Sequence, residues 1–165
     1  MIRLLTGSTH TGKTLLAQRL LERHGAPYLS IDHLKMGLIR SGMCPLTPES
    51  TDEALTAVRE IVKTAVENGQ SLTVEGCYIP FNWREDFDAS CLPHIRFLCL
   101  VFSEAYIRTR FDTIQTHANA IERRKDDSFC TMELLLAENR RNLEACRRRG
   151  LPYYLIDGPY APPLD

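Results

Sequence analysis

The chain has 165 residues, of which 44% are hydrophobic and 25% charged, and its formal net charge is −1. This length suits one globular domain with a sizeable core, and the charge balance argues against a general affinity for nucleic acid or anionic membranes. No apolar run approaches the ~18 residues of a membrane span, and no charged-then-apolar secretory signal precedes the polar stretch at Gly7. We therefore expect no membrane, nucleic-acid or obligate protein partner.

The six cysteines form no C-x-x-C pair and do not cluster with histidines. Several lie within apolar runs, where a thiol behaves as a small buried side chain. Free thiols in a reducing compartment are the expected state, and we expect a cytoplasmic protein.

Five short apolar runs predict β-strands, and stretches with helical spacing of apolar residues separate them. Thr47 and Pro48 predict the start of the longest helix, and Ser103 predicts the cap of another. The predicted strands are 2–6, 27–31, 71–75, 94–102 and 152–156. The predicted helices are 13–24, 33–40, 47–68, 103–117 and 131–149. This alternation predicts an α/β fold with a parallel sheet covered on both faces.

One polar residue or glycine lies at the carboxyl end of each predicted strand. These residues are Gly7, Asp32, Glu75, Ser103 and Asp157. Ligands of open parallel sheets bind outside the carboxyl ends of the strands. The sequence therefore predicts the functional site at that edge.

The first strand runs into an octapeptide that fits the pattern G-x-x-x-x-G-K-[ST]. It reads Gly7-Ser8-Thr9-His10-Thr11-Gly12-Lys13-Thr14. Its glycines allow a tight turn that points backbone amides at phosphate oxygens, while Lys13 reaches the β- and γ-phosphates and the Thr14 hydroxyl takes Mg²⁺. His10 occupies a variable position, where we expect its side chain to be tolerated. The octapeptide, hereafter the phosphate loop, predicts binding of ATP with Mg²⁺.

With this loop near its N-terminus, its length and its five-strand alternation, the chain resembles the small P-loop kinases grouped around nucleoside monophosphate kinases and shikimate kinase. The resemblance covers nearly the whole chain. It implies a three-layer P-loop fold with strand order 2-3-1-4-5, and ATP with Mg²⁺ as the donor. It also implies one kinase domain over 1–165, with a lid at about 116–130 and an acceptor-binding region at about 33–68.

The stretch Arg123-Arg124-Lys125-Asp126-Asp127 is similar to the R-x-D-D segment at the end of the lid in adenylate kinases. The resemblance implies that Arg123 and Arg124, and more weakly Arg140, neutralise charge on the transferring phosphoryl group. The alternative is a charged loop in solvent. The resemblance further implies that Arg108 or Arg110 stacks on the base, and that the loop 157–160 closes the base pocket.

On the acceptor side, Asp32 follows the second strand. A kinase for hydroxyl acceptors needs a carboxylate to take the hydroxyl proton or to hold the hydroxyl in line, whereas a phosphate acceptor is already anionic. Asp32 therefore favours an alcohol acceptor, and the alternative is that it only caps the next helix.

Three further residues are candidates for the acceptor side: Glu75 near the magnesium waters or the acceptor, Arg40 for an acidic acceptor, and Tyr78. Tyr78 lies in an aromatic stretch with Phe81 and Trp83. These rings wall an acceptor pocket or pack over the edge of the core, and the sequence leaves both readings open.

The sequence thus predicts an ATP-dependent kinase for a small molecule, with a hydroxyl acceptor favoured. One alternative is a nucleotide kinase with a phosphate acceptor. The other, from a different class, is a non-catalytic nucleotide-binding switch protein.

Overall fold

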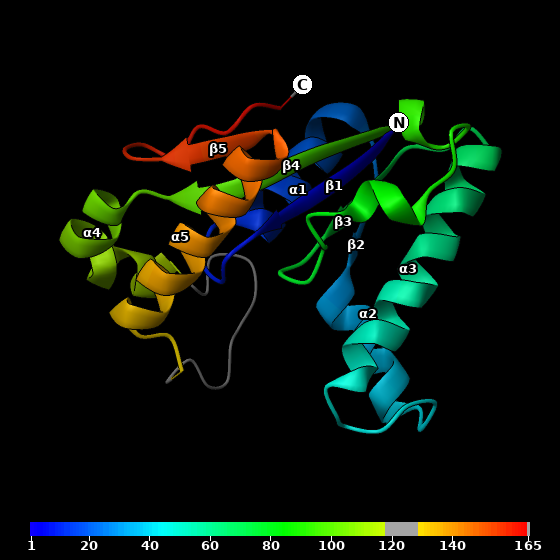
Figure 1. Cartoon of the computed structure of the whole chain (residues 1–165), viewed down its shortest axis with the longest axis horizontal. Helices are drawn as coiled ribbons and strands as arrows, with labels where there is room; N and C mark the ends of the chain where they lie inside the picture. Colours follow the sequence, from blue (N-terminus) through cyan, green and yellow to red (C-terminus); the bar gives the residue numbers. More distant parts are fainter. Residues whose placement is uncertain (118–128, 165) are drawn as a thin grey trace.

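A computed structural model describes residues 1–117 and 129–164. Five parallel strands form one sheet in the order β2-β3-β1-β4-β5 (Figure 1). The strands are β1 (Ile2–Gly7), β2 (Tyr28–Ser30), β3 (Leu72–Glu75), β4 (Ile95–Phe102) and β5 (Tyr153–Ile156). The predicted strand order is confirmed.

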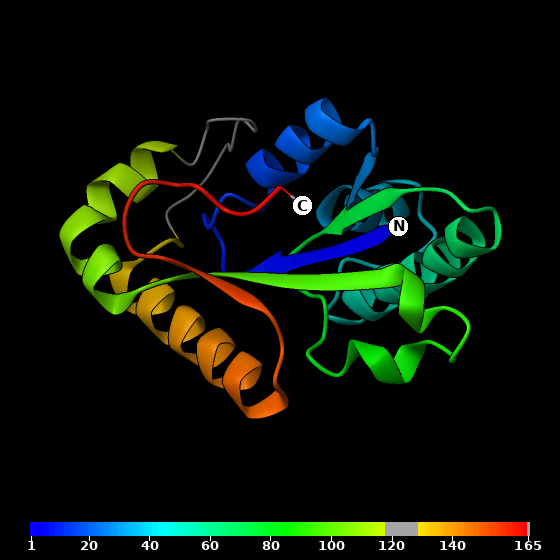
Figure 2. The same ribbon diagram turned by 90° about the horizontal axis from the view of Figure 1, so that it is seen from above.

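Helices cover both faces of the sheet, as Figure 2 shows with α1 and α5 on opposite sides. The helices are α1 (Lys13–His24), α2 (Ile31–Arg40), α3 (Glu49–Glu67), α4 (Glu104–Thr116) and α5 (Met132–Arg149). Two short 3-10 helices, η1 (Trp83–Asp86) and η2 (Leu92–His94), lie between β3 and β4. The three-layer α/β arrangement follows from the near-continuous apolar strands, which are buried on both sides.

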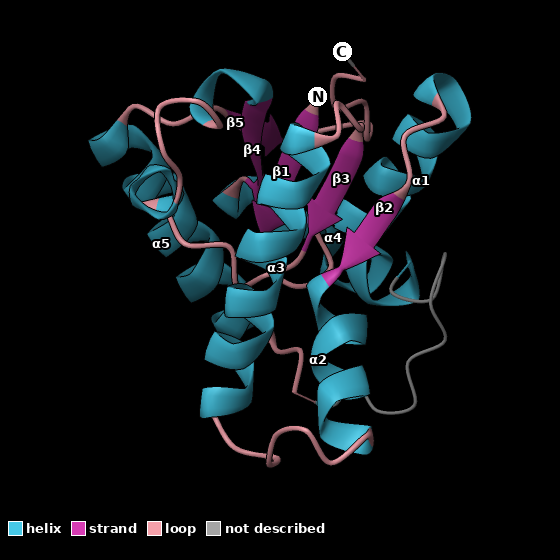
Figure 3. Cartoon of the chain, turned by 90° about the vertical axis from the view of Figure 1, so that its right-hand side faces the viewer, coloured by secondary structure: helices cyan, strands magenta, loops and turns pink. Residues whose placement is uncertain are grey.

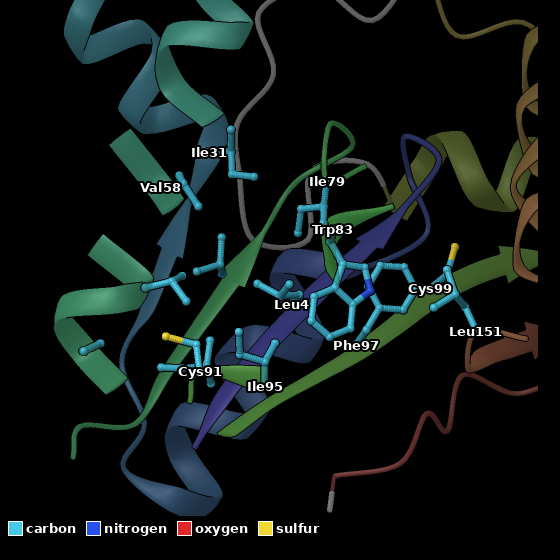
Figure 4. Close-up of a cluster of buried hydrophobic side chains, with 14 of the residues drawn as sticks. Leu4, Ile31, Val58, Ile79, Trp83, Cys91, Ile95, Phe97, Cys99 and Leu151 are labelled. Atoms are coloured by element: carbon cyan, nitrogen blue, oxygen red, sulfur yellow. The ribbon is translucent and has the colours of Figure 1, made fainter. Parts of the chain in front are cut away.

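Alternate residues of β4 supply the two halves of the core. Phe97, Cys99 and Val101 face one cluster with α3, and Leu100 and Phe102 face the other with α1 and α4. Figure 4 shows the first cluster, where the Trp83 indole stacks on the Phe97 ring at 6.0 Å between centroids. The period-two alternation of a strand is what divides one apolar run between two faces.

Helices α2 and α3 pack side by side and extend beyond the carboxyl edge of the sheet (Figures 1 and 3). Together they hold most of the predicted acceptor-binding region, 33–68.

Two predicted helix starts were wrong. Helix α2 begins at Ile31, because β2 pairs with β3 only over Tyr28–Ser30 and the chain turns directly after the last pair. Helix α3 begins at Glu49 with Pro48 in the N-cap position, so Thr47 is not the cap. The Thr47 carbonyl instead accepts from the Ser50 amide at 3.1 Å, in a turn that precedes the helix.

None of the six cysteines forms a disulfide; five are buried and Cys77 is exposed. Within the described residues, no helix has the length and apolar character to cross a lipid bilayer.

Candidate active site

The strands end together at one edge of the sheet. Glu75, the last residue of β3, pairs with Ser30 of β2 on one side and with Leu5 of β1 on the other. Neighbouring strands lie about 4.8 Å apart, so the residues that follow these three strands must meet. The register therefore brings the phosphate loop, Glu75 and the start of α2 to one place.

The phosphate loop turns on two glycines with left-handed φ angles. Gly7 has φ 146° and Gly12 has φ 79°, and His10 between them also has a positive φ of 66°. A Cβ on Gly7 would lie 2.4 Å from the Leu100 carbonyl oxygen, so the strand end leaves no room for a side chain. No side chain of the described residues caps the α1 N-terminus. The first amides of a helix have no intrahelical partner, and together with the positive end of the helix dipole they can bind an anion.

Ser8 forms hydrogen bonds through both its carbonyl and its hydroxyl. Its carbonyl accepts from the Lys13 ammonium and from the Thr11 hydroxyl, each at 2.8 Å. Its own hydroxyl donates to the Glu138 carboxylate of α5 at 2.6 Å. Lys13 is buried, so its charge lies inside the loop. The hydrogen bonds around Ser8 hold that charge where phosphate oxygens would bind.

Thr14 and Glu75 face each other at the base of the loop. The Thr14 hydroxyl donates to a Glu75 carboxylate oxygen at 3.4 Å, and Glu75 is only 3% exposed. Mg²⁺ prefers oxygen ligands, and kinases usually hold it with one or two protein oxygens together with substrate phosphates. Thr14 and Glu75 together offer the oxygen atoms that such a Mg²⁺ site requires.

Asp32 lies in the first turn of α2, exposed, beside the Tyr78 phenol. Burial raises the pKa of Tyr78 above its usual value, and the negative charge of Asp32 raises it further. The Lys35 ammonium lies 4.8 Å from the centre of the same ring. The alternative that Asp32 caps α2 was wrong, because Ser30 occupies the N-cap position. The structure thus brings Asp32 and Tyr78 together.

The other two aromatic residues of this stretch pack in the core or at its edge. Phe81 packs edge-on against Phe97, and Trp83 is buried against it. For Trp83 the core-edge reading holds. Phe81 is partly buried at the core edge and also lines a cavity beside the phosphate loop, so Phe81 and Tyr78 both remain candidates for the acceptor side.

Arg40 ends α2 and is exposed. At 1.5 Å per residue, its Cα lies about 12 Å along the helix axis from that of Asp32. The structure therefore places Arg40 near the outer end of the α2–α3 pair and not beside Asp32.

A cavity of about 480 Å³ lies between α4 and the segment that follows β5. Arg110 and residues Asp157, Gly158 and Pro159 contribute to its lining. Arg110 departs from helical geometry, with φ −129° and ψ 19° inside α4. Arg108 is not among the lining residues; it pairs with Glu104 at 2.8 Å and holds the pKa of that carboxyl below its usual value.

A second cavity, of about 390 Å³, opens beside the first residues of the phosphate loop. Gly7 and Ser8 line one side, Cys77 another, and Glu138 and Arg141 of α5 a third. Because this cavity lies next to the phosphate loop, it is a candidate binding place for an acceptor.

Solved structures of kinases share this architecture over most of the chain. A gluconokinase from Sinorhizobium meliloti 1021 is 19% identical, with 98% of this chain and 83% of that chain covered at a TM-score of 0.56. A sugar kinase from Janibacter sp. HTCC2649 is 18% identical, with 94% and 84% covered at a TM-score of 0.58. A deoxyadenosine kinase from M. mycoides is 12% identical, with 95% and 90% covered at a TM-score of 0.54. The chain has the small P-loop kinase fold.

No protein-family model matches the chain, and no curated protein sequence matches it. The predicted resemblance to small P-loop kinases is confirmed at the level of the fold by the solved structures alone.

In this P-loop kinase fold, the predicted lid arginines Arg123 and Arg124 lie outside the described residues. Arg140 points to α4, where its guanidinium lies 3.5 Å from the Glu104 carboxylate. The following residue, Arg141, lines the cavity beside the phosphate loop, as does Arg148.

Sequence reasoning missed Glu138 and Arg141 as site residues, and it placed Tyr160 only in the loop expected to close the base pocket, not against the phosphate loop. Glu138 and Arg141 are three residues apart on α5, so helical spacing places them on one face, but only the packing of α5 against β4 shows that this face meets the phosphate loop. Tyr160 donates a hydrogen bond to the Gly12 carbonyl. No local signal in the sequence connects residues so far apart.

Proposed function

We propose that this chain transfers the γ-phosphoryl group of ATP to a hydroxyl of a small-molecule acceptor. The supporting observation is the carboxyl edge of the sheet, where the phosphate loop with its buried Lys13 lies next to Asp32 and Tyr78. Phosphoryl transfer depends mainly on positioning and charge stabilisation. At this edge, the phosphate loop and Lys13 can stabilise charge, and Asp32 and Tyr78 can position the acceptor.

On the donor side, the amides of residues 7–14 and the Lys13 ammonium bind the phosphates. On binding, Lys13 exchanges its bond to the Ser8 carbonyl for phosphate oxygens. Arg110 and residues 157–159 bind the base. Arg108 can contact the base only if its ion pair with Glu104 breaks. Mg²⁺, when bound at Thr14 and near Glu75, neutralises charge on the β- and γ-phosphates.

On the acceptor side, Asp32 takes the proton of the acceptor hydroxyl while the hydroxyl oxygen forms the bond to the γ-phosphorus. The bond from the γ-phosphorus to the bridging oxygen breaks, and ADP leaves with that oxygen. Tyr78 orients the acceptor beside Asp32, and Arg40 contacts only an acceptor long enough to extend along α2. Arg123 and Arg124 neutralise the phosphoryl group in the transition state, a role for which the sequence alone gives support.

A screen of Mg·ATP consumption tests the proposal. Hydroxyl-bearing metabolites, sugar acids among them, form one arm and nucleoside monophosphates the other. We expect acceptor-dependent ADP formation in the hydroxyl arm. Turnover confined to the monophosphate arm would favour the nucleotide-kinase alternative, and ATP binding without turnover on any acceptor would favour the switch protein.

A further inference from the structure

Tyr160 connects the segment after β5 with the phosphate loop. Its hydroxyl donates to the Gly12 carbonyl oxygen at 2.6 Å, across 148 residues of sequence. The same carbonyl accepts the Leu16 amide at 2.9 Å, in the first turn of α1. Gly12 therefore has a second hydrogen bond that the helix itself does not require.

The Gly12 carbonyl and the Lys13 amide belong to one peptide group. That group is planar and trans, so fixing the direction of the oxygen fixes the opposite direction of the N–H. The Lys13 amide is among the first amides of α1, which have no intrahelical partner and face the phosphates. A hydrogen bond to the oxygen also polarises the group and strengthens the N–H as a donor.

The Tyr160 ring is held firmly enough to act in this way. It packs against the core cluster of α1 and α4, and the Arg19 guanidinium lies 5.3 Å from its centre. A Cβ on Gly12 would lie 2.8 Å from the ring, so the loop and the ring are in direct contact. Burial raises the pKa of Tyr160 above its usual value, which keeps the hydroxyl protonated as a donor.

Tyr160 follows immediately on Asp157, Gly158 and Pro159, which line the cavity beside α4. The Ser103 hydroxyl donates to the Asp157 carboxylate and fixes the other end of this segment to the start of α4. One short segment therefore contacts the proposed base cavity and the proposed phosphate cradle.

We propose that Tyr160 is a positioning residue that orients the Gly12–Lys13 peptide for the triphosphate, and so couples the base cavity to the phosphate loop. The inference rests on the proposed function, because it assumes that the loop binds a triphosphate. It adds a residue that touches neither the phosphates nor the acceptor.

Calorimetry on the full chain tests this with two probes, Mg·ATP and Mg·tripolyphosphate, the second of which lacks a base. Tyr160→Phe removes only the hydroxyl, and Tyr154→Phe, a half-buried tyrosine of the same core cluster, is the matched control. We expect Tyr160→Phe to bind both probes about three- to tenfold more weakly, the usual range for one lost hydrogen bond. The control should bind both as wild type does.

A wild-type chain that binds Mg·ATP, with a Tyr160→Phe variant of equal affinity for both probes, would overturn the inference and leave the proposed function standing. Loss for Mg·ATP alone would also overturn it, because the tyrosine would then act at the base. Failure of the wild type to bind either probe would overturn both. As a second readout, the Lys13 amide proton of the ligand-free chain should move upfield in Tyr160→Phe, and an unchanged resonance would contradict the polarised peptide.

Discussion

At the scale of single residues, the Lys13 ammonium is held by a backbone carbonyl of the phosphate loop. Lys13 is buried, and among the described residues its ammonium donates to the Ser8 carbonyl, a neutral partner. A buried cation without an anionic partner is costly, and an arriving phosphate relieves that cost. The loop is therefore prepared for an anion.

Replacing Lys13 with alanine removes this cation. We expect Lys13→Ala to lower Mg·ATP affinity by about tenfold or more, since charge-assisted hydrogen bonds contribute about 1.5–3 kcal/mol, and to abolish turnover. Calorimetry measures the first effect. Lys63→Ala, which removes a partly exposed lysine paired with Glu60 on α3, is the control. Unchanged nucleotide affinity in Lys13→Ala would show that the loop does not bind ATP.

Asp32 separates a hydroxyl acceptor from a phosphate acceptor. We expect Asp32→Asn to reduce turnover on an alcohol by about 10²- to 10⁴-fold, the usual contribution of a positioned base, with Mg·ATP affinity near wild type. Steady-state kinetics and a melting curve check this. Asp52→Asn is matched, because Asp52 also lies exposed in the first turn of a helix, α3. Near-wild-type turnover of Asp32→Asn on an alcohol would refute its role as the base.

At the scale of elements, hydroxyl caps fix the two helices that flank the gap in the described chain. The Ser103 hydroxyl accepts from the Tyr106 amide at 3.0 Å at the start of α4, and the Thr131 hydroxyl accepts from the Leu134 amide at 3.1 Å at the start of α5. Of these two caps, only the Ser103 hydroxyl also donates to Asp157, which lines the proposed base cavity.

This difference makes a prediction about the two caps. Ser103→Ala and Thr131→Ala should each lower the free energy of unfolding by about 1 kcal/mol, which corresponds to a fall in melting temperature of about 2–4 °C. Only Ser103→Ala should also weaken Mg·ATP binding, because it frees the segment that bears Asp157. Equal nucleotide affinities in the two variants would show that the Ser103–Asp157 contact does not shape the base cavity.

Element by element, the sequence patterns anticipated what local chemistry controls. The alternation of strands and helices, the limits of α1 and the cap at Ser103 follow from apolar runs, glycine stops and a hydroxyl residue, whereas the strand order was implied by the resemblance to small P-loop kinases. The starts of α2 and α3 could not be predicted from these patterns, because they depend on the pairing of β2 with β3 and on the turn at Thr47.

The same limit applies to the site. The phosphate loop could be read directly, because its chemistry lies in eight consecutive residues. The contacts of Ser8 with Glu138 and of Gly12 with Tyr160 could not, because they join segments 130 and 148 residues apart. Contacts of that kind depend on how α5 and the segment after β5 return to the sheet.

At the scale of the whole molecule, the fold brings the proposed donor-side and acceptor-side residues to one edge of the sheet. The phosphate loop extends from the central strand β1, the base cavity lies toward β5, and Asp32 and Tyr78 lie toward β2. A nucleotide that lies across this edge from α4 to the loop would direct its γ-phosphate toward Asp32. Strand order therefore accounts for the direction of the proposed transfer.

The most direct test of the central claim is ³¹P NMR of the complete reaction, with Mg·ATP and the acceptor selected by the screen. The account predicts a new phosphomonoester resonance that grows with one equivalent of ADP, and no growth with Asp32→Asn over the same period. Formation of a phosphoanhydride in place of a monoester, or release of inorganic phosphate only, would contradict transfer to a hydroxyl.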